Sequence, residues 1–134
     1  MNQEVINNVV EGHDPKKHAR SFLYAFNGLK HILINEANFR IHLLVSLLVI
    51  LLALFLKFNY MEWVVLVITI GFVMCMEIVN SMVEELTDHL VKEHHEGVRI
   101  VKDVGASFVL IAAFVSFIVG LLLFLPKLLA ILNY

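Results

Sequence analysis

Four polar residues in one apolar stretch have the types and the spacing needed to handle a proton near a membrane surface. Glu77, Asn80, Glu84 and Asp88 follow one another at steps of three or four residues. On a helix this spacing places them within an arc of roughly 80°. The stretch begins in an apolar run and ends among charged residues, so it predicts a polar stripe that leads out of a membrane into water.

Glu77 lies about two helical turns inside the end of its apolar run. A carboxylate within a membrane costs a few kcal/mol on insertion scales and usually faces a cavity, a partner or a reaction path. This position favours a proton acceptor over a permanently charged ligand. The alternative is structural, with Glu77 forming a polar clamp between helices together with Asn80 or Ser81.

Two further glutamates lie where a carboxylate can stay ionised. Glu84 follows Glu77 by about two turns, and Glu36 precedes the first apolar run. Mg²⁺ accepts one or two protein carboxylates and takes its remaining ligands from phosphate and water, so both residues are candidate metal ligands. The alternatives are a solvated helix end for Glu84 and an ion pair between Glu36 and Arg40 at i+4.

Lys102 and Asp103 stand directly before the third apolar run, which holds both side chains near the interface. A lysine there can bind phosphate as a point charge, and an aspartate can accept a hydrogen bond from a ligand or a lysine. The pair can equally be a membrane anchor and a charge at a helix N-terminus. Gly105, two residues on, allows a neighbouring helix or a ligand to approach closely.

The composition places these residues in a membrane protein. The chain has 134 residues, of which 60% are hydrophobic and 16% charged, and its mean hydropathy is +0.83. These values predict a single membrane domain over residues 16–134, after a polar tail at 1–15. The net charge of −2 leaves no electrostatic footprint for nucleic acid. The single cysteine, Cys75, permits no internal disulfide.

Three apolar runs are close to the roughly 20 residues that a helix needs to cross a bilayer. They predict an all-α protein with spans at about 39–58, 63–83 and 104–125. A turn at 57–59 is expected to join the first two spans, and Pro126 with Lys127 to stop the third. From Ser21 to Asn35, apolar residues recur at three- and four-residue steps. This segment predicts an amphipathic helix, either on the membrane surface or packed on the protein's own bundle.

The distribution of lysine and arginine predicts the orientation in the membrane. Five lie before the apolar run at 41–56, one between this run and the second, three in the second loop and one after the third span. Because cytoplasmic loops carry an excess of these residues, the N-terminus and the loop at 84–103 are expected in the cytoplasm. The polar stripe then faces the cytoplasm.

The common nucleotide-binding motifs are absent from the sequence. It contains no G-x-x-x-x-G-K-[ST], no G-x-G-x-x-G and no D-F-G. His94 and His95 lack the spaced partners of a transition-metal site, which favours a solvated loop. A proton-coupled transport or channel subunit would explain Glu77 but not the polar residues at the water side. A non-enzymatic assembly or regulatory subunit would make the stripe structural.

The order of the polar residues carries more information than their chemistry alone. They occur in the segments Asn35-Glu36-Ala37-Asn38-Phe39-Arg40, Glu77-Ile78-Val79-Asn80-Ser81-x-x-Glu84, His95 and Lys102-Asp103-x-Gly105. Together these segments resemble the prokaryotic diacylglycerol kinase family, which includes the undecaprenol kinases of Gram-positive bacteria. The resemblance covers residues 16–126, and Leu-Pro-Lys-Leu at 125–128 is more similar to the undecaprenol kinase branch.

The resemblance implies a homotrimer in the bacterial plasma membrane, with active sites shared between neighbouring subunits and facing the cytoplasm. It implies transfer of phosphate from ATP, with Mg²⁺, to a lipid alcohol, with undecaprenol expected and diacylglycerol as the alternative. It further implies that Glu77 is the general base with Asn80 as its polar neighbour, and that Glu36 and Glu84 hold the metal. The implied nucleotide contacts are Lys17, Tyr24, Glu36, Glu84, Glu93, His95, Lys102 and Asp103.

Overall fold

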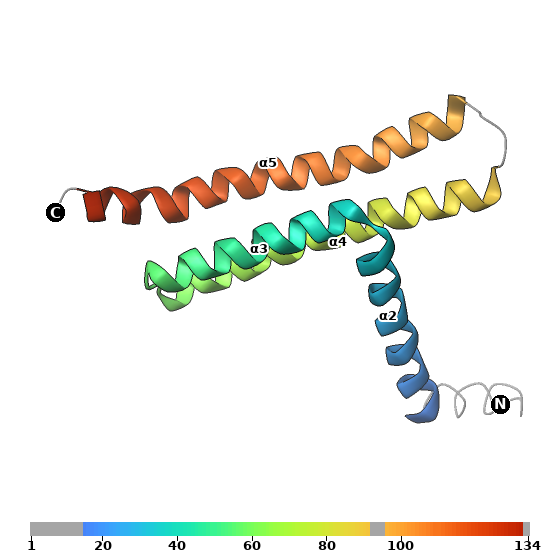
Figure 1. Cartoon of the computed structure of the whole chain (residues 1–134), viewed down its shortest axis with the longest axis horizontal. Helices are drawn as coiled ribbons and strands as arrows, with labels where there is room; N and C mark the ends of the chain where they lie inside the picture. The colour runs from blue at the N-terminus through green and yellow to red at the C-terminus, as the bar shows by residue number, and fades with distance from the viewer. Residues whose placement is uncertain (1–14, 92–95, 133–134) are drawn as a thin grey trace, which may run out of the picture. The chain divides into compact units, whose positions relative to one another are not determined.

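The computed structural model describes residues 15–91 and 96–132, which are helical apart from short connections and contain no strand (Figure 1). The helices are α2 (Pro15–Asn35), α3 (Ala37–Phe55), α4 (Tyr60–Leu90) and α5 (Glu96–Leu132). Three of them, α3, α4 and α5, are long and apolar enough to cross a membrane. The all-α fold with three helices able to span a membrane and a further N-terminal helix is therefore confirmed.

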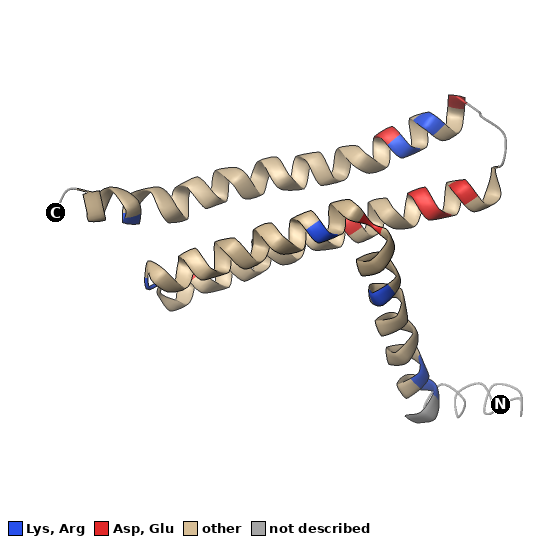
Figure 2. Ribbon diagram, viewed as in Figure 1, with Lys and Arg blue, Asp and Glu red and all other residues tan. Residues whose placement is uncertain are grey.

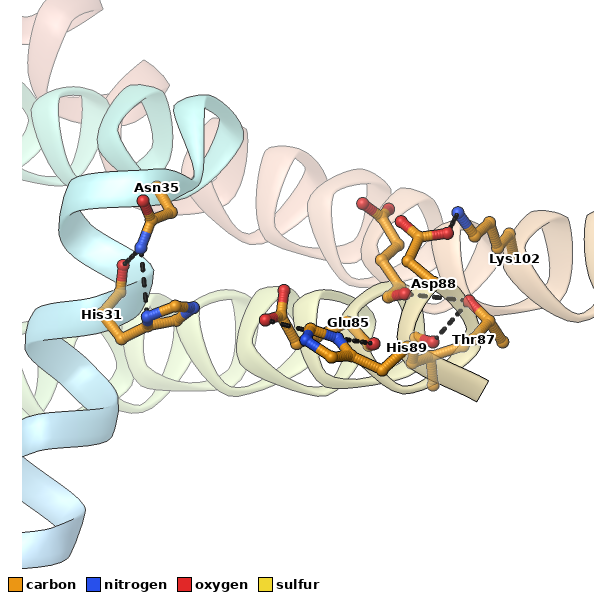
Figure 3. A network of polar contacts seen from close by, with 9 residues as sticks. His31, Asn35, Glu85, Thr87, Asp88, His89 and Lys102 are labelled. Carbon is orange, nitrogen blue, oxygen red and sulfur yellow. Dashed lines mark hydrogen bonds and ion pairs between the residues drawn. The ribbon is translucent and has the colours of Figure 1, made fainter. Parts of the chain in front are cut away.

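The chain divides into two units, one ending at Asn35 and one beginning at Glu36. Helix α2 belongs to the first unit and is described by itself. It begins at Pro15, where proline is well tolerated because the first helical N–H has no partner within the helix. Near its C-terminus the Asn35 side chain donates to the His31 carbonyl at 2.9 Å (Figure 3). The predicted helix is confirmed, and its place at the membrane surface stays a prediction.

A left-handed residue ends α3 at the predicted turn. Lys57 has a φ of 51°, the N–H of Phe58 donates to the Ala53 carbonyl at 3.2 Å, and the N–H of Lys57 donates to the Leu54 carbonyl at 3.1 Å. These are the two bonds of a Schellman cap. The side chain of Phe58 is buried in one cluster with Ala53, Leu56 and Leu66, so the turn brings α3 back against α4.

A capping box starts α4 immediately after this turn. The Asn59 side chain accepts from the Glu62 N–H at 3.0 Å, and the Glu62 carboxylate accepts from the Asn59 N–H at 2.6 Å. At 1.5 Å per residue, the 31 residues of α4 extend about 46 Å, more than the ~30 Å hydrocarbon layer of a bilayer. One end of α4 must therefore reach into the headgroups or water.

The helix of the third span does not end at Pro126, where the sequence predicted a stop. Helix α5 runs through Pro126 to Leu132. A proline removes one backbone hydrogen bond, and membrane helices tolerate this loss where neighbouring groups support the chain. Lys127, the next residue, joins this part of α5 to the start of α4, because its ammonium lies 3.0 Å from the Glu62 carboxylate and 5.3 Å from the centre of the Phe58 ring.

Helix α4 packs against both α3 and α5. A groove of about 490 Å³ lies beside α4 and takes its walls from α3, α4 and α5. We call it the α3–α5 groove; its lining is almost entirely apolar and includes His42, Val49, Ile70, Val73, Phe117 and Leu128. Figure 2 shows that the middle of α5 carries no charge, whereas charged residues gather near the ends of α4 and α5 that the 92–95 segment joins.

Candidate active site

The polar stripe predicted from the sequence lies on α4, and its burial changes along the helix. Glu77 is 2% exposed and Asn80 5%. Glu84 is half-buried and Asp88 is exposed. The stripe therefore runs from the interior of the helix bundle outward, as its spacing predicts.

Asn80 holds the half-buried glutamate of the stripe in place. Its side-chain NH₂ donates to the Glu84 carboxylate at 2.7 Å. Its amide oxygen is buried without a hydrogen-bond partner in the described chain. That oxygen faces α5 at Gly105, where an added β-carbon would come within 2.9 Å of it. A residue without a side chain at 105 thus lets α5 pack directly onto the Asn80 amide.

Glu77 faces α3 rather than its neighbours on α4. Its carboxylate lies 3.9 Å from Nε2 of His42. Within the described residues, neither Asn80 nor Ser81 donates to it: the Asn80 NH₂ bonds to Glu84, and the buried Ser81 hydroxyl has no partner. A clamp between Glu77 and these two residues is therefore not what the structure contains. Sequence reasoning missed His42, although a histidine in an apolar run was a signal.

Glu36 completes a group of three carboxylates. It is the N-cap residue of α3, but its side chain makes no capping hydrogen bond, and it is half-buried. Helices α3 and α4 run in opposite directions, and His42 of α3 lies next to Glu77 of α4. Glu36, six residues before His42, and Glu84, seven residues after Glu77, therefore lie toward the same end of the two helices.

The donor set of this group suits Mg²⁺ better than a transition metal. No group of three or more His, Cys, Asp or Glu residues in the described part of the chain is arranged to hold a metal ion. Mg²⁺ does not require such a group, because it binds through one or two carboxylates and keeps waters and phosphate oxygens as its other ligands. Glu36 and Glu84 offer oxygen donors of this kind.

Lys102 and Asp103, adjacent in sequence, have different surroundings. Lys102 is half-buried and forms an ion pair across to Asp88, the outer member of the stripe (Figure 3). Asp103 is exposed and lies 3.9 Å from Arg99 on α5 itself. Successive helical residues point about 100° apart, which explains the difference. The structure brings Lys102 to the stripe, and sequence reasoning did not identify Asp88 as its partner.

The other predicted nucleotide contacts lie elsewhere in the chain. Lys17 and Tyr24 are exposed residues of α2, the helix that is described by itself. Glu93 and His95 fall outside the described residues. The roles assigned to these four residues stay predictions.

Comparison with known proteins identifies the family. The sequence profile of the prokaryotic diacylglycerol kinases matches residues 23–124. The chain belongs to the prokaryotic diacylglycerol kinase family. It is 31% identical to the undecaprenol kinase of Bacillus subtilis (strain 168) over 109 residues, which are 81% of this chain and 89% of that protein.

The chain is also similar to two diacylglycerol kinases. That of Synechocystis sp. is 38% identical over 112 residues, which cover 83% of this chain and 64% of that protein. That of Escherichia coli (strain K12) is 37% identical over 95 residues, which cover 71% of this chain and 78% of that protein. The chain is thus a lipid kinase of a bacterial membrane, and the transport-subunit and assembly-subunit hypotheses are not favoured.

Membership in this kinase family gives the carboxylate group a chemical context. A kinase must gather negatively charged phosphates beside a hydroxyl that loses its proton. The structure offers one carboxylate removed from water, Glu77, two carboxylates with more exposure, Glu36 and Glu84, and one ammonium, that of Lys102.

Proposed function

We propose that this lipid kinase transfers the terminal phosphoryl group of ATP to the hydroxyl of undecaprenol, at the cytoplasmic face of the membrane and with Mg²⁺. The observation that carries the proposal is the burial of Glu77 on the same helix as the less buried Glu84, with Lys102 of the adjoining helix paired to Asp88 at the outer end of the stripe. The buried carboxylate suits a general base, and the outer groups suit a metal-bound triphosphate.

In the proposed reaction Glu77 accepts the proton of the lipid hydroxyl as the oxygen attacks the terminal phosphorus of ATP. The bond from that phosphorus to the bridging oxygen breaks, and ADP leaves. Phosphoryl transfer depends mostly on positioning and on neutralising charge. Glu36 and Glu84 would hold Mg²⁺, which when bound offsets the negative charge of the phosphates. Asn80 keeps the Glu84 carboxylate oriented through its 2.7 Å hydrogen bond.

Lys102 would contribute a positive charge to the same phosphates. In the described chain its ammonium is paired with Asp88, so a triphosphate must compete with that carboxylate. Ammonium groups bind phosphate as point charges without a fixed geometry. Lys102 can therefore exchange one oxygen partner for another with a small movement.

The location of the reaction follows from the two substrates. ATP comes from water, whereas the lipid hydroxyl lies at the headgroup level of one leaflet. The stripe passes through this level as its burial decreases from Glu77 to Asp88. The excess of lysine and arginine in the N-terminal segment and the second loop supports the cytoplasmic side.

The α3–α5 groove supports a long-chain acceptor. It is lined by His42, which contacts Glu77, and extends to Leu128, next to the lysine that pairs with Glu62. The α5 wall of the groove runs from Ala113 to Leu128, about 22 Å at 1.5 Å per residue. A long acyl or prenyl chain suits a groove of this length. The similarity to an undecaprenol kinase over 89% of its length is consistent with this acceptor.

We further propose that the active enzyme is a homotrimer. Most of the surface of α3, α4 and α5 is exposed within one chain. Three helices enclose little volume for a site that must hold a nucleotide and a lipid. Association of subunits supplies the missing walls.

Side-by-side lipid phosphorylation tests the acceptor. The purified protein in phospholipid vesicles would receive radiolabelled ATP, Mg²⁺ and either undecaprenol or diacylglycerol at equal mole fraction. We expect kcat/KM to be at least about tenfold higher for undecaprenol, the scale on which pocket contacts discriminate substrates. Equal or faster phosphorylation of diacylglycerol would reverse the assignment of the acceptor. ATP hydrolysis without a phosphorylated lipid would contradict the proposed reaction.

A further inference from the structure

His42 is the side chain that connects Glu77 with the α3–α5 groove. It lines the groove, whereas Glu77 does not. Its Nε2 lies 3.9 Å from the Glu77 carboxylate, and within the described residues no other basic side chain is within ion-pair distance of Glu77. The His42 side chain is 27% exposed and that of Glu77 is 3% exposed. An acceptor in the groove therefore meets His42 beside the base.

The backbone around His42 is held firmly in α3. The hydroxyl of Ser46, one turn later, donates to the His42 carbonyl at 2.8 Å. Phe39, almost one turn earlier, is buried. His42 thus extends from a firmly held backbone, whereas the Glu77 side chain has three rotatable bonds and no hydrogen bond from Asn80 or Ser81.

We propose that His42 is a positioning residue for the Glu77 carboxylate, and that it limits the rotamers from which Glu77 can receive the proton of the acceptor. This inference rests on the proposed function, in which Glu77 is the base. At 3.9 Å the two groups are neighbours without a direct hydrogen bond. Proton transfer is sensitive to such positioning, because a displacement of about 1 Å can lower a rate about 10²-fold.

A positioning role makes a prediction that a purely structural role does not. If His42 acts through Glu77, removal of His42 should lower kcat. The KM for ATP should stay unchanged, because other residues are proposed to bind the nucleotide. In a Glu77→Gln background, removal of His42 should lower kcat no further. Residues that act as one unit show this kind of non-additivity.

The experiment measures kcat and KM for ATP in His42→Ala, His42→Gln, Glu77→Gln and the His42→Ala/Glu77→Gln double variant, with undecaprenol in vesicles. We expect His42→Ala to lower kcat about 10- to 100-fold with the KM for ATP within twofold. His42→Gln keeps an N–H donor and should recover at least part of this loss. The double variant should be no slower than Glu77→Gln alone.

His89→Ala is the matched control. His89 forms a second histidine–glutamate pair on α4, with Glu85 at 3.7 Å, but its side chain is 73% exposed (Figure 3). Exposed pairs of this kind contribute little, so His89→Ala should keep wild-type kinetics. The thermal unfolding of each variant in detergent is recorded on the same samples.

Three outcomes would overturn the inference. The first is a wild-type kcat in His42→Ala. The second is a double variant slower than Glu77→Gln by the full factor of His42→Ala, which indicates independent roles. The third concerns His42→Gln, which decides the question if His42→Ala does not fold. A higher KM for ATP in His42→Gln at unchanged kcat would contradict the positioning role. Failure of the proposed function itself gives a different result, namely a wild type that phosphorylates no lipid.

Discussion

Glu77 and Glu84 are the same type of side chain about two turns apart on α4, yet they have different surroundings. Glu77 is 2% exposed and faces a histidine of another helix. Glu84 is half-buried and accepts a hydrogen bond from Asn80. Removal from water favours a group that takes up a proton, and access to water favours a group that shares a metal with phosphates.

Glu84→Gln should weaken the binding of MgATP, because an amide is a poorer Mg²⁺ ligand than a carboxylate. We expect the KM for ATP to rise roughly tenfold, and part of the activity to return at high Mg²⁺. The measurement is the KM for ATP across a Mg²⁺ titration. Glu85→Gln is the control, since Glu85 is the exposed neighbour that pairs with His89. If the KM of Glu84→Gln for ATP does not depend on the Mg²⁺ concentration, Glu84 is not a metal ligand.

The sequence predicted which residues are polar and buried, but not all of their partners. Periodicity along α4 placed Glu77, Asn80, Glu84 and Asp88 on one face, and the structure confirms this. The pairs His42–Glu77 and Asp88–Lys102 join different helices. They depend on the register between those helices, which a repeat within one helix does not contain.

At the scale of the elements, the contact between α4 and α5 positions polar side chains of the candidate site. These helices approach closely where Gly105 meets Asn80, since a β-carbon at 105 would lie 2.9 Å from the amide oxygen. The same Asn80 side chain holds Glu84. The packing of α5 and the orientation of a proposed metal ligand are therefore coupled through one amide.

Gly105→Ala should disturb both stability and activity. The new methyl group displaces the Asn80 amide, and overpacking of this kind costs about 1 to 3 kcal/mol. We expect a lower unfolding temperature in detergent and a higher KM for ATP. Gly71→Ala is the control, because no atom lies within 4 Å of a β-carbon at position 71. A Gly105→Ala protein as stable and active as Gly71→Ala would contradict the coupling.

The helices themselves were predictable from hydropathy, and their ends were less so. Apolar runs identified the three spans, and the turn at 57–59 followed from its composition. The continuation of α5 beyond Pro126 was not predicted. Beyond the proline, Lys127 contacts Glu62 and Phe58, and contacts between helices are not contained in a local sequence signal.

At the scale of the whole molecule, the orientation decides whether ATP can reach the site. We expect a tag at the N-terminus and one inserted near Glu96 to be cytoplasmic, and a tag at the C-terminus to be external. Protease accessibility in right-side-out and inverted vesicles measures all three positions. A tag near Glu96 outside the cell would contradict both the orientation and the supply of ATP.

Sharing of active sites between subunits is tested by mixing two inactive variants. Glu77→Gln and Glu84→Ala subunits, expressed together, should recover part of the activity if base and metal ligand come from different protomers. The recovered activity is compared with that of each variant alone, at equal amounts of isolated mixed oligomer. Complete inactivity of well-folded mixed oligomers would place base and metal ligand in the same subunit.

The most direct test of the account is lipid phosphorylation by Glu77→Gln, measured with ATP binding on the same oligomeric protein. The amide keeps the size and hydrogen bonding of the side chain but cannot accept the proton. The account predicts that kcat falls by about 10² to 10⁴ while the affinity for ATP stays near that of the wild type. Near-normal turnover in Glu77→Gln would contradict it, because the buried glutamate would then not be the base.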